Sequence, residues 1–310
     1  MQRTRQEILD AIATGPVSGP ALADRLDVSR TAVWKHVEAL RDAGFEIPSG
    51  EEGYRLASVP DYGAAAIEYG LRAPYEVEFH DAVESTNAVA RERAEGGARD
   101  LVVLADEQTG GRGRQDRSWA SPSGGVWMSL VLRPDLPPAR VPLLTLAAAV
   151  AVTEAIADRG IEATIKWPND VHLADDGLGP KLCGVLTEMT GESDRVSWVV
   201  VGIGLNANVD PDALPEGATS LEAAAEPVDR RTLVQDVLHR FDALAGRPDD
   251  IVDAWRSHAA TLGARVRIDT GTSAFEGTAV DVTATGALVV EGDGDRRTIH
   301  AGDCEHLREV

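Results

Sequence analysis

The spacing of apolar residues changes twice along this chain, and each change marks a different kind of structure. Residues 1–60 contain three segments with apolar residues at helical spacing, followed by two short strand-like segments. From about Tyr75 strand-like and helical segments alternate, and the last helix is expected over 250–262. After Gly263 short β segments are separated by glycine turns, and the last strand is expected over 296–303. The sequence therefore predicts an α+β protein with three domains, at 1–60, 70–262 and 263–310, and a linker near 57–66.

The first domain has the element order of a winged helix-turn-helix. Helices are expected within 5–12, 18–28 and 29–44, with Ser18 and Ser29 as N-caps, and a hairpin is expected over 45–56. In such modules the last helix enters the major groove of DNA. The residues of that helix predicted to contact DNA are Ser29, Arg30, Thr31, Trp34, Lys35 and His36. The alternative is that they form an ordinary solvated helix face.

The charge of the chain is strongly negative. Its 310 residues carry a formal net charge of −21, and lysine occurs only at Lys35, Lys166 and Lys181. An acidic, lysine-poor surface is expected of a protein from a high-salt cytoplasm, although a GC-rich genome would also encode arginine in place of lysine. The chain has two cysteines, no apolar N-terminal segment and no run of about 18 apolar residues. These features predict a cytoplasmic protein that does not span a membrane.

A loop rich in arginine and glycine contrasts with this acidic background. The segment GGRGRQDRSW, residues 110–119, lies between two predicted strands and contains Arg112, Arg114 and Arg117. Glycine lets the backbone approach a ligand closely, and arginine offers a planar fork of donors that suits phosphate and carboxylate. The loop is therefore a candidate anion clamp. The alternative is a solvated loop whose arginines pair with surface carboxylates.

Two of the three lysines lie at the ends of predicted strands. Lys166 begins KWPND, which ends a strand in a turn, and Lys181 begins KLCGVLTE, which opens another strand. A single lysine at a strand end is usually a surface residue, but two in a lysine-poor chain, both beside turn residues, indicate a site. The segment GIGLN at 202–206 adds two glycines and Asn206, although paired glycines also permit tight strand packing.

Five segments occur in the order and spacing of the biotin protein ligase family. They are ESTN, ADEQTGGRGRQDRSW, KWPND, KLCGVLTE and GIGLN, at residues 84–87, 105–119, 166–170, 181–188 and 202–206. With the winged helix in front, the whole chain resembles the bifunctional members that also repress the biotin operon. The resemblance implies a class II synthetase-like central domain and an SH3-like C-terminal β-barrel. Asp116 departs from the family pattern, which usually has glycine there, and an acid at this position could pair with Arg117 or weaken anion binding.

The resemblance also implies an activity and a set of site residues. Such enzymes activate biotin with ATP and Mg²⁺ to biotinyl-5′-AMP and transfer biotin to a lysine of the biotin carboxyl carrier domain of an acyl-CoA carboxylase. It assigns catalysis to Lys181 and Arg114. It assigns biotin binding to Ser85, Thr86, Asn87, Gln108, Gly111, Arg112, Gly113, Arg114, Lys181 and Gly184. It assigns ATP or adenylate binding to Arg112, Arg114, Arg117, Trp119, Lys166, Asp170 and Asn206, with Arg308 reaching the ATP phosphates.

Some of these assignments have alternatives. Without the resemblance, Ser85–Asn87 would be interpreted as a helix N-cap. Asp170 either orients Lys181 or helps to hold magnesium. Cys183 is expected to be a small apolar filler of its strand, and the histidines show no metal-ligand spacing.

Two competing functions share parts of this pattern. One is a transcription factor that senses biotin without ligating it, and the other is a lipoate ligase. The intact Arg/Gly loop together with Lys181 favours catalysis, and the loop together with the C-terminal β-domain favours biotin. By resemblance, the further partners are operator DNA and a second copy of the chain, joined through the central sheets.

Overall fold

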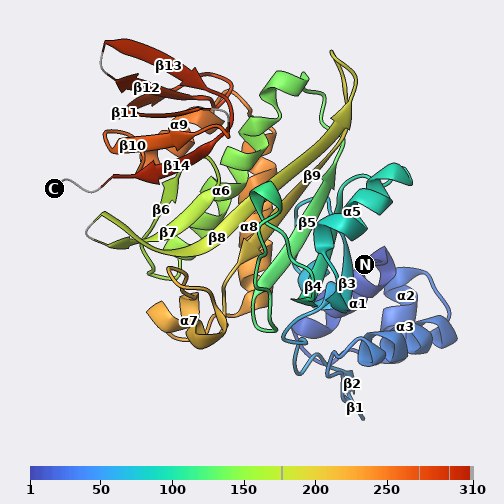
Figure 1. Cartoon of the computed structure of the whole chain (residues 1–310). Helices are drawn as coiled ribbons and strands as arrows, with labels where there is room; N and C mark the ends of the chain where they lie inside the picture. The colour runs from blue at the N-terminus through green and yellow to red at the C-terminus, as the bar shows by residue number, and fades with distance from the viewer. Residues whose placement is uncertain (176, 272, 293, 308–310) are drawn as a thin grey trace. The chain divides into compact units, whose positions relative to one another are not determined.

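The computed structural model describes residues 1–175, 177–271, 273–292 and 294–307 (Figure 1). The chain divides into two compact units, Met1–Leu71 and Arg72–Val310. Arg308 therefore lies outside the described residues, as does the side chain of Asp116.

The first unit has the predicted helix–helix–helix–wing order. It contains α1 (Arg3–Ala13), α2 (Gly19–Leu26), α3 (Arg30–Asp42), β1 (Ser49–Gly50), β2 (Gly53–Tyr54) and a further short helix, α4 (Ala64–Glu68). The two predicted caps are confirmed, because Ser18 Oγ accepts a hydrogen bond from the Ala21 amide and Ser29 Oγ accepts one from the Ala32 amide. The core is formed by apolar residues at helical spacing, among them Ile8, Leu9, Ile12, Leu22, Val33, Val37 and Leu40.

The second unit is built on a seven-stranded sheet. Across the sheet the order is β3 (Glu76–Val83), β4 (Leu101–Gln108), β5 (Val126–Leu132), β9 (Val196–Leu205), β8 (Gly177–Gly191), β7 (Asp170–Asp175) and β6 (Ala163–Lys166). The β3–β4 pair is parallel and the other neighbours are antiparallel. Because side chains alternate between the faces of a strand, β5 and β9 each contribute to both faces.

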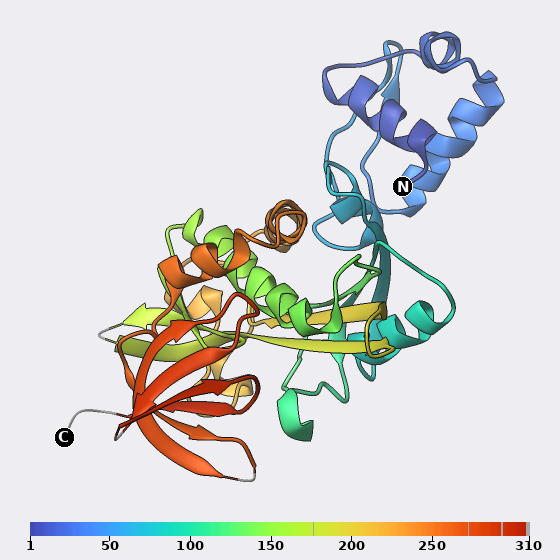
Figure 2. The same cartoon turned by 90° about the horizontal axis from the view of Figure 1, so that it is seen from above.

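Helices cover the two faces of this sheet unequally. On one face lie α6 (Pro142–Ala157), α8 (Arg230–Ala245) and α9 (Ile251–His258) (Figure 2). On the other face α5 (Thr86–Glu95) packs through Ala90 and Ala94 on Val103, Val131 and Val200. The short α7 (Leu221–Ala224) follows β9. Among the residues that the structure describes, α5 is therefore the one long helix on this face, and loops cover the rest of it.

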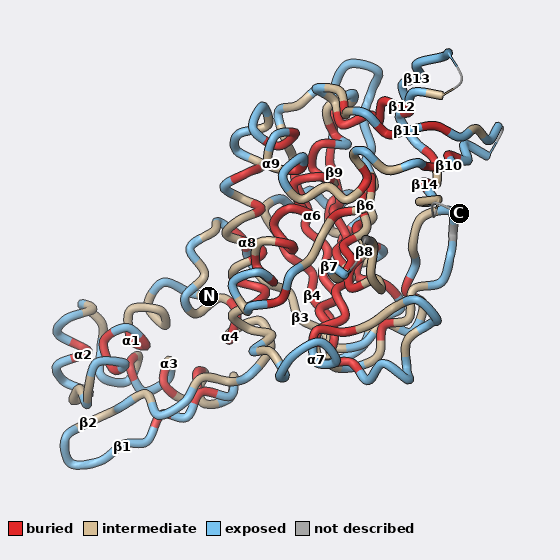
Figure 3. The backbone as a smooth tube through the Cα atoms, turned by 90° about the vertical axis from the view of Figure 1, so that its left-hand side faces the viewer, coloured by how far each residue is buried: buried red, intermediate tan, exposed pale blue. Residues whose placement is uncertain are grey.

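The most buried helix is α6, whose residues are apolar all round (Figure 3). The stretch Pro138–Ala157 is long and apolar enough to cross a membrane by length and composition, but 72% of its most apolar 18-residue part is buried inside the structure. Buried core helices pass the same test, and α6 packs against α8, α9 and β8. Among the described residues no other helix is long and apolar enough to cross a membrane, and we interpret α6 as the core helix of this unit.

The C-terminal segment forms a five-stranded antiparallel sheet. Its order is β13 (Asp295–Ile299), β12 (Leu288–Gly292), β11 (Ala274–Val282), β10 (Arg265–Asp269) and β14 (Asp303–His306). The prediction of a single strand over 296–303 was wrong: β13 ends at Ile299, and β14 begins at Asp303 and pairs with β10. The helix predicted to extend to Leu262 ends at His258, because the Ala260 amide donates to the Ile165 carbonyl instead of continuing the helix.

Candidate active site

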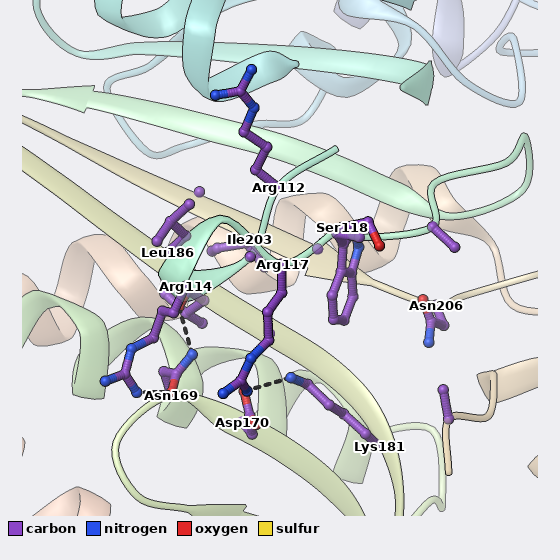
Figure 4. Close-up of a pocket in the computed structure, with 18 of the residues that line it drawn as sticks. Arg112, Arg114, Arg117, Ser118, Asn169, Asp170, Lys181, Leu186, Ile203 and Asn206 are labelled. Carbon is purple, nitrogen blue, oxygen red and sulfur yellow. Dashed lines mark hydrogen bonds and ion pairs between the residues drawn. The ribbon is translucent and has the colours of Figure 1, made fainter. Parts of the chain in front are cut away.

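A pocket of about 270 Å³ opens on the α5 face of the central sheet (Figure 4). Segments far apart in the sequence line it, including the start of α5, the Arg/Gly loop, β8, β9 and residues 214–218. The predicted site residues that line it are Ser85, Thr86, Asn87, Gln108, Arg112, Gly113, Arg114, Arg117, Trp119, Asp170, Lys181, Gly184 and Asn206. Gly111 and Lys166 do not line this pocket.

One end of the pocket is neutral and polar. The Gln108 side chain accepts a hydrogen bond from the Thr86 amide through Oε1 at 2.8 Å and donates one to Ser121 Oγ through Nε2 at 2.8 Å. Ser85 occupies the N-cap position of α5, but its side chain makes no capping hydrogen bond. The alternative interpretation of Ser85–Asn87 as a helix cap is therefore not supported by the side-chain contacts.

The other end of the pocket is cationic. Lys181 Nζ lies 2.7 Å from Asp170 Oδ1 and 5.0 Å from the centroid of the Trp119 ring. Asp170 is the first residue of β7 and is the register partner of Gly184 on β8, so the ion pair joins neighbouring strands. A carboxylate on one side and an aromatic face on the other hold the ammonium in place.

Two glycines make room for Trp119. A Cβ at Gly204 would lie 2.6 Å from Trp119 Nε1, and one at Gly184 would lie 3.2 Å from its Cζ3. The resemblance assigned Gly184 to biotin binding, and the segment GIGLN added Gly204 to the predicted site, but in this structure the indole ring approaches both glycines. The indole nitrogen is buried without a hydrogen-bond partner.

The three loop arginines have different partners. Arg114 donates to Asn169 Oδ1 at 3.0 Å and to the Gly302 carbonyl at 2.9 Å. Arg117 forms an ion pair with Asp303 on β14. Arg112 lies 3.6 Å from the Glu84 carboxylate and points away from Lys181 (Figure 4). In this structure, then, Arg112 and Arg117 pair with carboxylates, as in the alternative interpretation of the loop.

Lys166 lies in a neighbouring hollow. It shares this hollow with Arg114, Arg117, Asp170 and, from the C-terminal sheet, Arg267, Asp269, Asp303 and Glu305. Because Arg114, Arg117 and Asp170 line both cavities, the hollow adjoins the cationic end of the main pocket.

Asn206 directly follows β9 and has a free hydrogen-bond acceptor, whereas Cys183 on β8 has a thiol that stays protonated. Asn206 is 1% exposed; its Nδ2 donates to the Thr219 carbonyl, and its Oδ1 is buried without a partner. Burial raises the pKa of the Cys183 thiol, as expected for a small filler and not for a nucleophile. Among residues 1–175, 177–271, 273–292 and 294–307, no three His, Cys, Asp or Glu side chains converge as a metal site.

Sequence reasoning missed Ser121, Ser129 and Asn169, whose side chains hold predicted site residues. Ser129 gave a usable signal, since it is the one polar residue in the otherwise apolar segment Val126–Leu132. Asp303 gave none, because its contact with Arg117 spans 186 positions of the chain.

In the first unit, the predicted DNA-contacting residues lie along one side of α3. Ser29 serves as the cap of α3, Arg30, Thr31 and Lys35 are exposed, and His36 is half-buried. Trp34 is 53% exposed, which is unusual for so large an apolar side chain.

Comparison with known proteins gives the family. Residues 4–55 match the HTH domain, residues 80–206 the Biotin/lipoate A/B protein ligase family, and residues 261–307 the Biotin protein ligase C terminal domain. The bifunctional ligase/repressor BirA of Bacillus subtilis is 40% identical over 307 residues, which cover 93% of each chain. The chain belongs to the biotin protein ligase family.

Other members agree with this assignment. The biotin–[acetyl-CoA-carboxylase] ligase of Paracoccus denitrificans is 35% identical over 234 residues, covering 71% of this chain and 96% of the relative. The solved structure of the Aquifex aeolicus biotin protein ligase in complex with biotin and ATP superposes with a TM-score of 0.63 at 26% identity, over 75% of this chain and 99% of that one. The predicted class, a biotin protein ligase joined to a helix-turn-helix repressor domain, is confirmed.

Proposed function

We propose that this biotin ligase acts in two steps within the pocket. A carboxylate oxygen of biotin attacks the α-phosphorus of ATP, and the bond to the bridging oxygen breaks to release pyrophosphate. The amine of a carrier lysine then attacks the acyl carbon of biotinyl-5′-AMP, an amide forms, the amine loses a proton, and AMP leaves with the electron pair of the C–O bond. The first step brings two anions together, so it requires fixed cations.

The observation that carries this proposal is the meeting of a neutral polar end and a cationic end in one pocket. Ser85, Thr86, Asn87 and Gln108 would hold the biotin ring system. Lys181 and Arg114, with Arg112 and the backbone of Gly111 and Gly113, would hold the carboxylate and the α-phosphate. Gly184, whose missing side chain makes room for the Trp119 ring and the Lys181 side chain, would contact biotin through its backbone.

The nucleotide would occupy the side of the pocket near Trp119 and Asn206. Asn206 Oδ1 is a buried acceptor with no partner, and it suits the amino group of adenine. Arg117 and Lys166 would hold the outgoing phosphates. Three carboxylates line this pocket, those of Asp170, Glu216 and Asp303, and two of them are paired with Lys181 and Arg117. We therefore propose that Mg²⁺ enters bound to the phosphates of ATP.

We further propose that the winged helix binds operator DNA through α3. Exposed Arg30 and Lys35 suit phosphate contacts, and the exposed Trp34 ring supplies apolar contact area. The functional parts would be 1–60 for DNA, 70–262 for catalysis and 263–310 for support of the site. On family resemblance we also propose a homodimer, a cytoplasmic location, a carrier domain of an acyl-CoA carboxylase as acceptor and, from the charge of −21, a high-salt cytoplasm.

The proposal is tested by biotin-dependent exchange of pyrophosphate into ATP and by transfer of labelled biotin to a carrier domain. Lys181→Ala should lower exchange about 100-fold or more, because one preorganised cation at the reacting phosphate is lost. Arg247→Ala, which removes an exposed arginine paired with Asp250, is the control and should leave exchange unchanged.

Two other outcomes would replace the proposal. Biotin binding without exchange would make the protein a sensor. Exchange that responds to lipoate and not to biotin would make it a lipoate ligase. Operator binding that tightens with biotin and ATP would support the repressor role.

A further inference from the structure

Ser129 lies directly beneath the polar end of the pocket. It is 0% exposed on β5, and in register it pairs with Gly202 of β9, which pairs in turn with Leu186 of β8. These three residues therefore form a row across three neighbouring strands. Because Gly202, the middle residue of this row, has no side chain, there is space over it for a side chain from another element.

The side chain of Asn87 lies along this row. Its Oδ1 is 2.6 Å from Ser129 Oγ, its Nδ2 donates to the Leu186 carbonyl at 3.4 Å, and a Cβ at Gly202 would overlap it. The carbonyl can only accept, which fixes the amide with Nδ2 toward Leu186. Oδ1 must then face Ser129, and it accepts the proton that the hydroxyl provides.

Thr86 is tied to the same hydroxyl. Thr86 Oγ1 lies 2.8 Å from Ser129 Oγ and 3.1 Å from Gln108 Oε1. Ser129 and Thr86 have two hydroxyl protons between them, and their two remaining partners, Asn87 Oδ1 and Gln108 Oε1, are both acceptors. Both protons are therefore retained inside the protein, and a lone pair of Thr86 Oγ1 is what remains for a ligand.

We propose that Ser129 is a positioning residue that presents Thr86 to the ligand as a hydrogen-bond acceptor, and so selects a ring bearing N–H donors. The inference rests on the proposed function. Biotin carries such donors in its ureido ring, whereas the dithiolane ring of lipoate has none. A site arranged to accept hydrogen bonds discriminates against a ligand without donors, because its polar groups are left unpaired. Ser129 thus favours biotin over lipoate without touching either.

The test is isothermal titration of biotin and of lipoate, together with the KM values of the exchange reaction. In Ser129→Ala, Thr86 Oγ1 loses the 2.8 Å contact that fixes its position and keeps only the longer contact with Gln108 Oε1, and Asn87 Oδ1 loses a donor. Biotin should bind about tenfold more weakly, while lipoate binding and the KM for ATP should change less than about twofold. Ser129→Thr, which keeps the hydroxyl, should restore most of the biotin affinity. If Ser129→Ala does not fold, Ser129→Cys fills the same space with a weak donor and replaces it.

Thr153→Ala is the matched control. It removes a buried hydroxyl from α6, where Thr153 Oγ1 donates to the Ala149 carbonyl, and it should leave biotin affinity unchanged. Equal weakening of biotin and lipoate by Ser129→Ala, or no weakening of either, overturns the inference. Wild-type protein that binds biotin but forms no adenylate refutes the proposed ligase and leaves this comparison of affinities valid.

Discussion

At the scale of single residues, the position of the Lys181 ammonium at the proposed reacting centre depends on one ion pair and one aromatic ring. Lys181 is one of only three lysines, and its ammonium is held by Asp170 at 2.7 Å and by the face of Trp119. An ammonium on a four-carbon stem has many rotamers, so fixing it in advance removes an ordering cost from the reaction. Asp170 is therefore better placed to orient Lys181 than to bind a metal ion.

This assignment of Asp170 predicts the behaviour of Asp170→Asn. The neutral amide weakens a charge-assisted contact, so kcat for adenylate formation should fall about tenfold. The Mg²⁺ concentration that gives half-maximal rate should stay constant, because the carboxylate is not a metal ligand. A Mg²⁺ titration of the exchange reaction checks this, with Asp249→Asn at an exposed position as control. A clear shift of the Mg²⁺ midpoint would assign Asp170 to the metal instead.

At the scale of elements, the Arg/Gly loop is shared between the central domain and the C-terminal sheet. Arg114 donates to the carbonyl of Gly302, and Arg117 pairs with the carboxylate of Asp303. Asp303 is the first residue of β14, and Gly302 directly precedes it. Two of the arginines proposed to bind phosphate, Arg114 and Arg117, are thus engaged by the C-terminal segment in this structure. Nucleotide binding by the proposed mechanism requires them to exchange these partners for phosphate oxygens.

Local patterns explain which elements were predictable. Ser18 and Ser29 predict the starts of their helices, because a capping side chain and the amide that it accepts from are only three positions apart. The continuous apolar run of Val126–Leu132 predicts a buried strand. The split between β13 and β14 was missed because β14 is defined by its pairing with β10, more than 30 positions earlier. No local pattern encodes such a pairing.

The site was predictable to a similar extent. Motifs placed Thr86, Gln108 and Lys181 in one pocket, but they could not show that Arg117 pairs with Asp303. Ser129 could have been found, since a lone hydroxyl in an apolar strand requires a partner. Its partners on α5 became visible only with the fold.

The junction between the central domain and β14 contains a half-buried histidine, His306. The Trp167 amide donates to Thr261 Oγ1 at 2.9 Å, and Thr261 Oγ1 lies 3.1 Å from His306 Nε2. Burial, with the nearby charge of Lys166 and then His172, lowers the pKa of His306 to about 4. The imidazole is therefore neutral at pH 7, and it can accept the hydroxyl proton of Thr261.

This histidine should make the fold sensitive to acid. The folded-state pKa of about 4 lies below the ordinary value of 6.5, so the unfolded chain binds the extra proton first as pH falls. The contribution of His306 to stability is complete above about pH 6.5 and is lost as pH falls toward 4. Urea unfolding of His306→Gln at several pH values should show a shallower decline across this window than the wild-type protein. His300→Gln, at an exposed position, should follow the wild-type curve; parallel curves for all three proteins would refute the prediction.

At the scale of the whole molecule, the negative charge is concentrated outside the DNA-binding domain. Residues 1–60 contain seven basic and nine acidic residues, so they carry −2 of the total of −21 and the rest of the chain carries −19. Ion pairs on the surface neutralise individual carboxylates, but the excess carboxylates outnumber the cations, and their mutual repulsion opposes the compact state. A domain that must approach DNA gains from being nearly neutral, because a strongly negative one would be repelled by the phosphates.

Salt should therefore stabilise the second unit more than the first. The Debye length falls from about 10 Å at 0.1 M to about 3 Å at 1 M, so repulsion between carboxylates is screened over this range. Exposed ion pairs are screened as well, but each contributes little to stability. The excess of acidic residues therefore decides that salt raises the stability of the second unit. Hydrogen exchange of the full chain, followed by segment in 0.1 M and 2 M KCl, should show increased protection in the strands of 72–310 and little change in 1–60. Equal gains in both units would indicate a general effect of salt on apolar burial, and loss of protection in 72–310 would show that ion pairs outweigh repulsion.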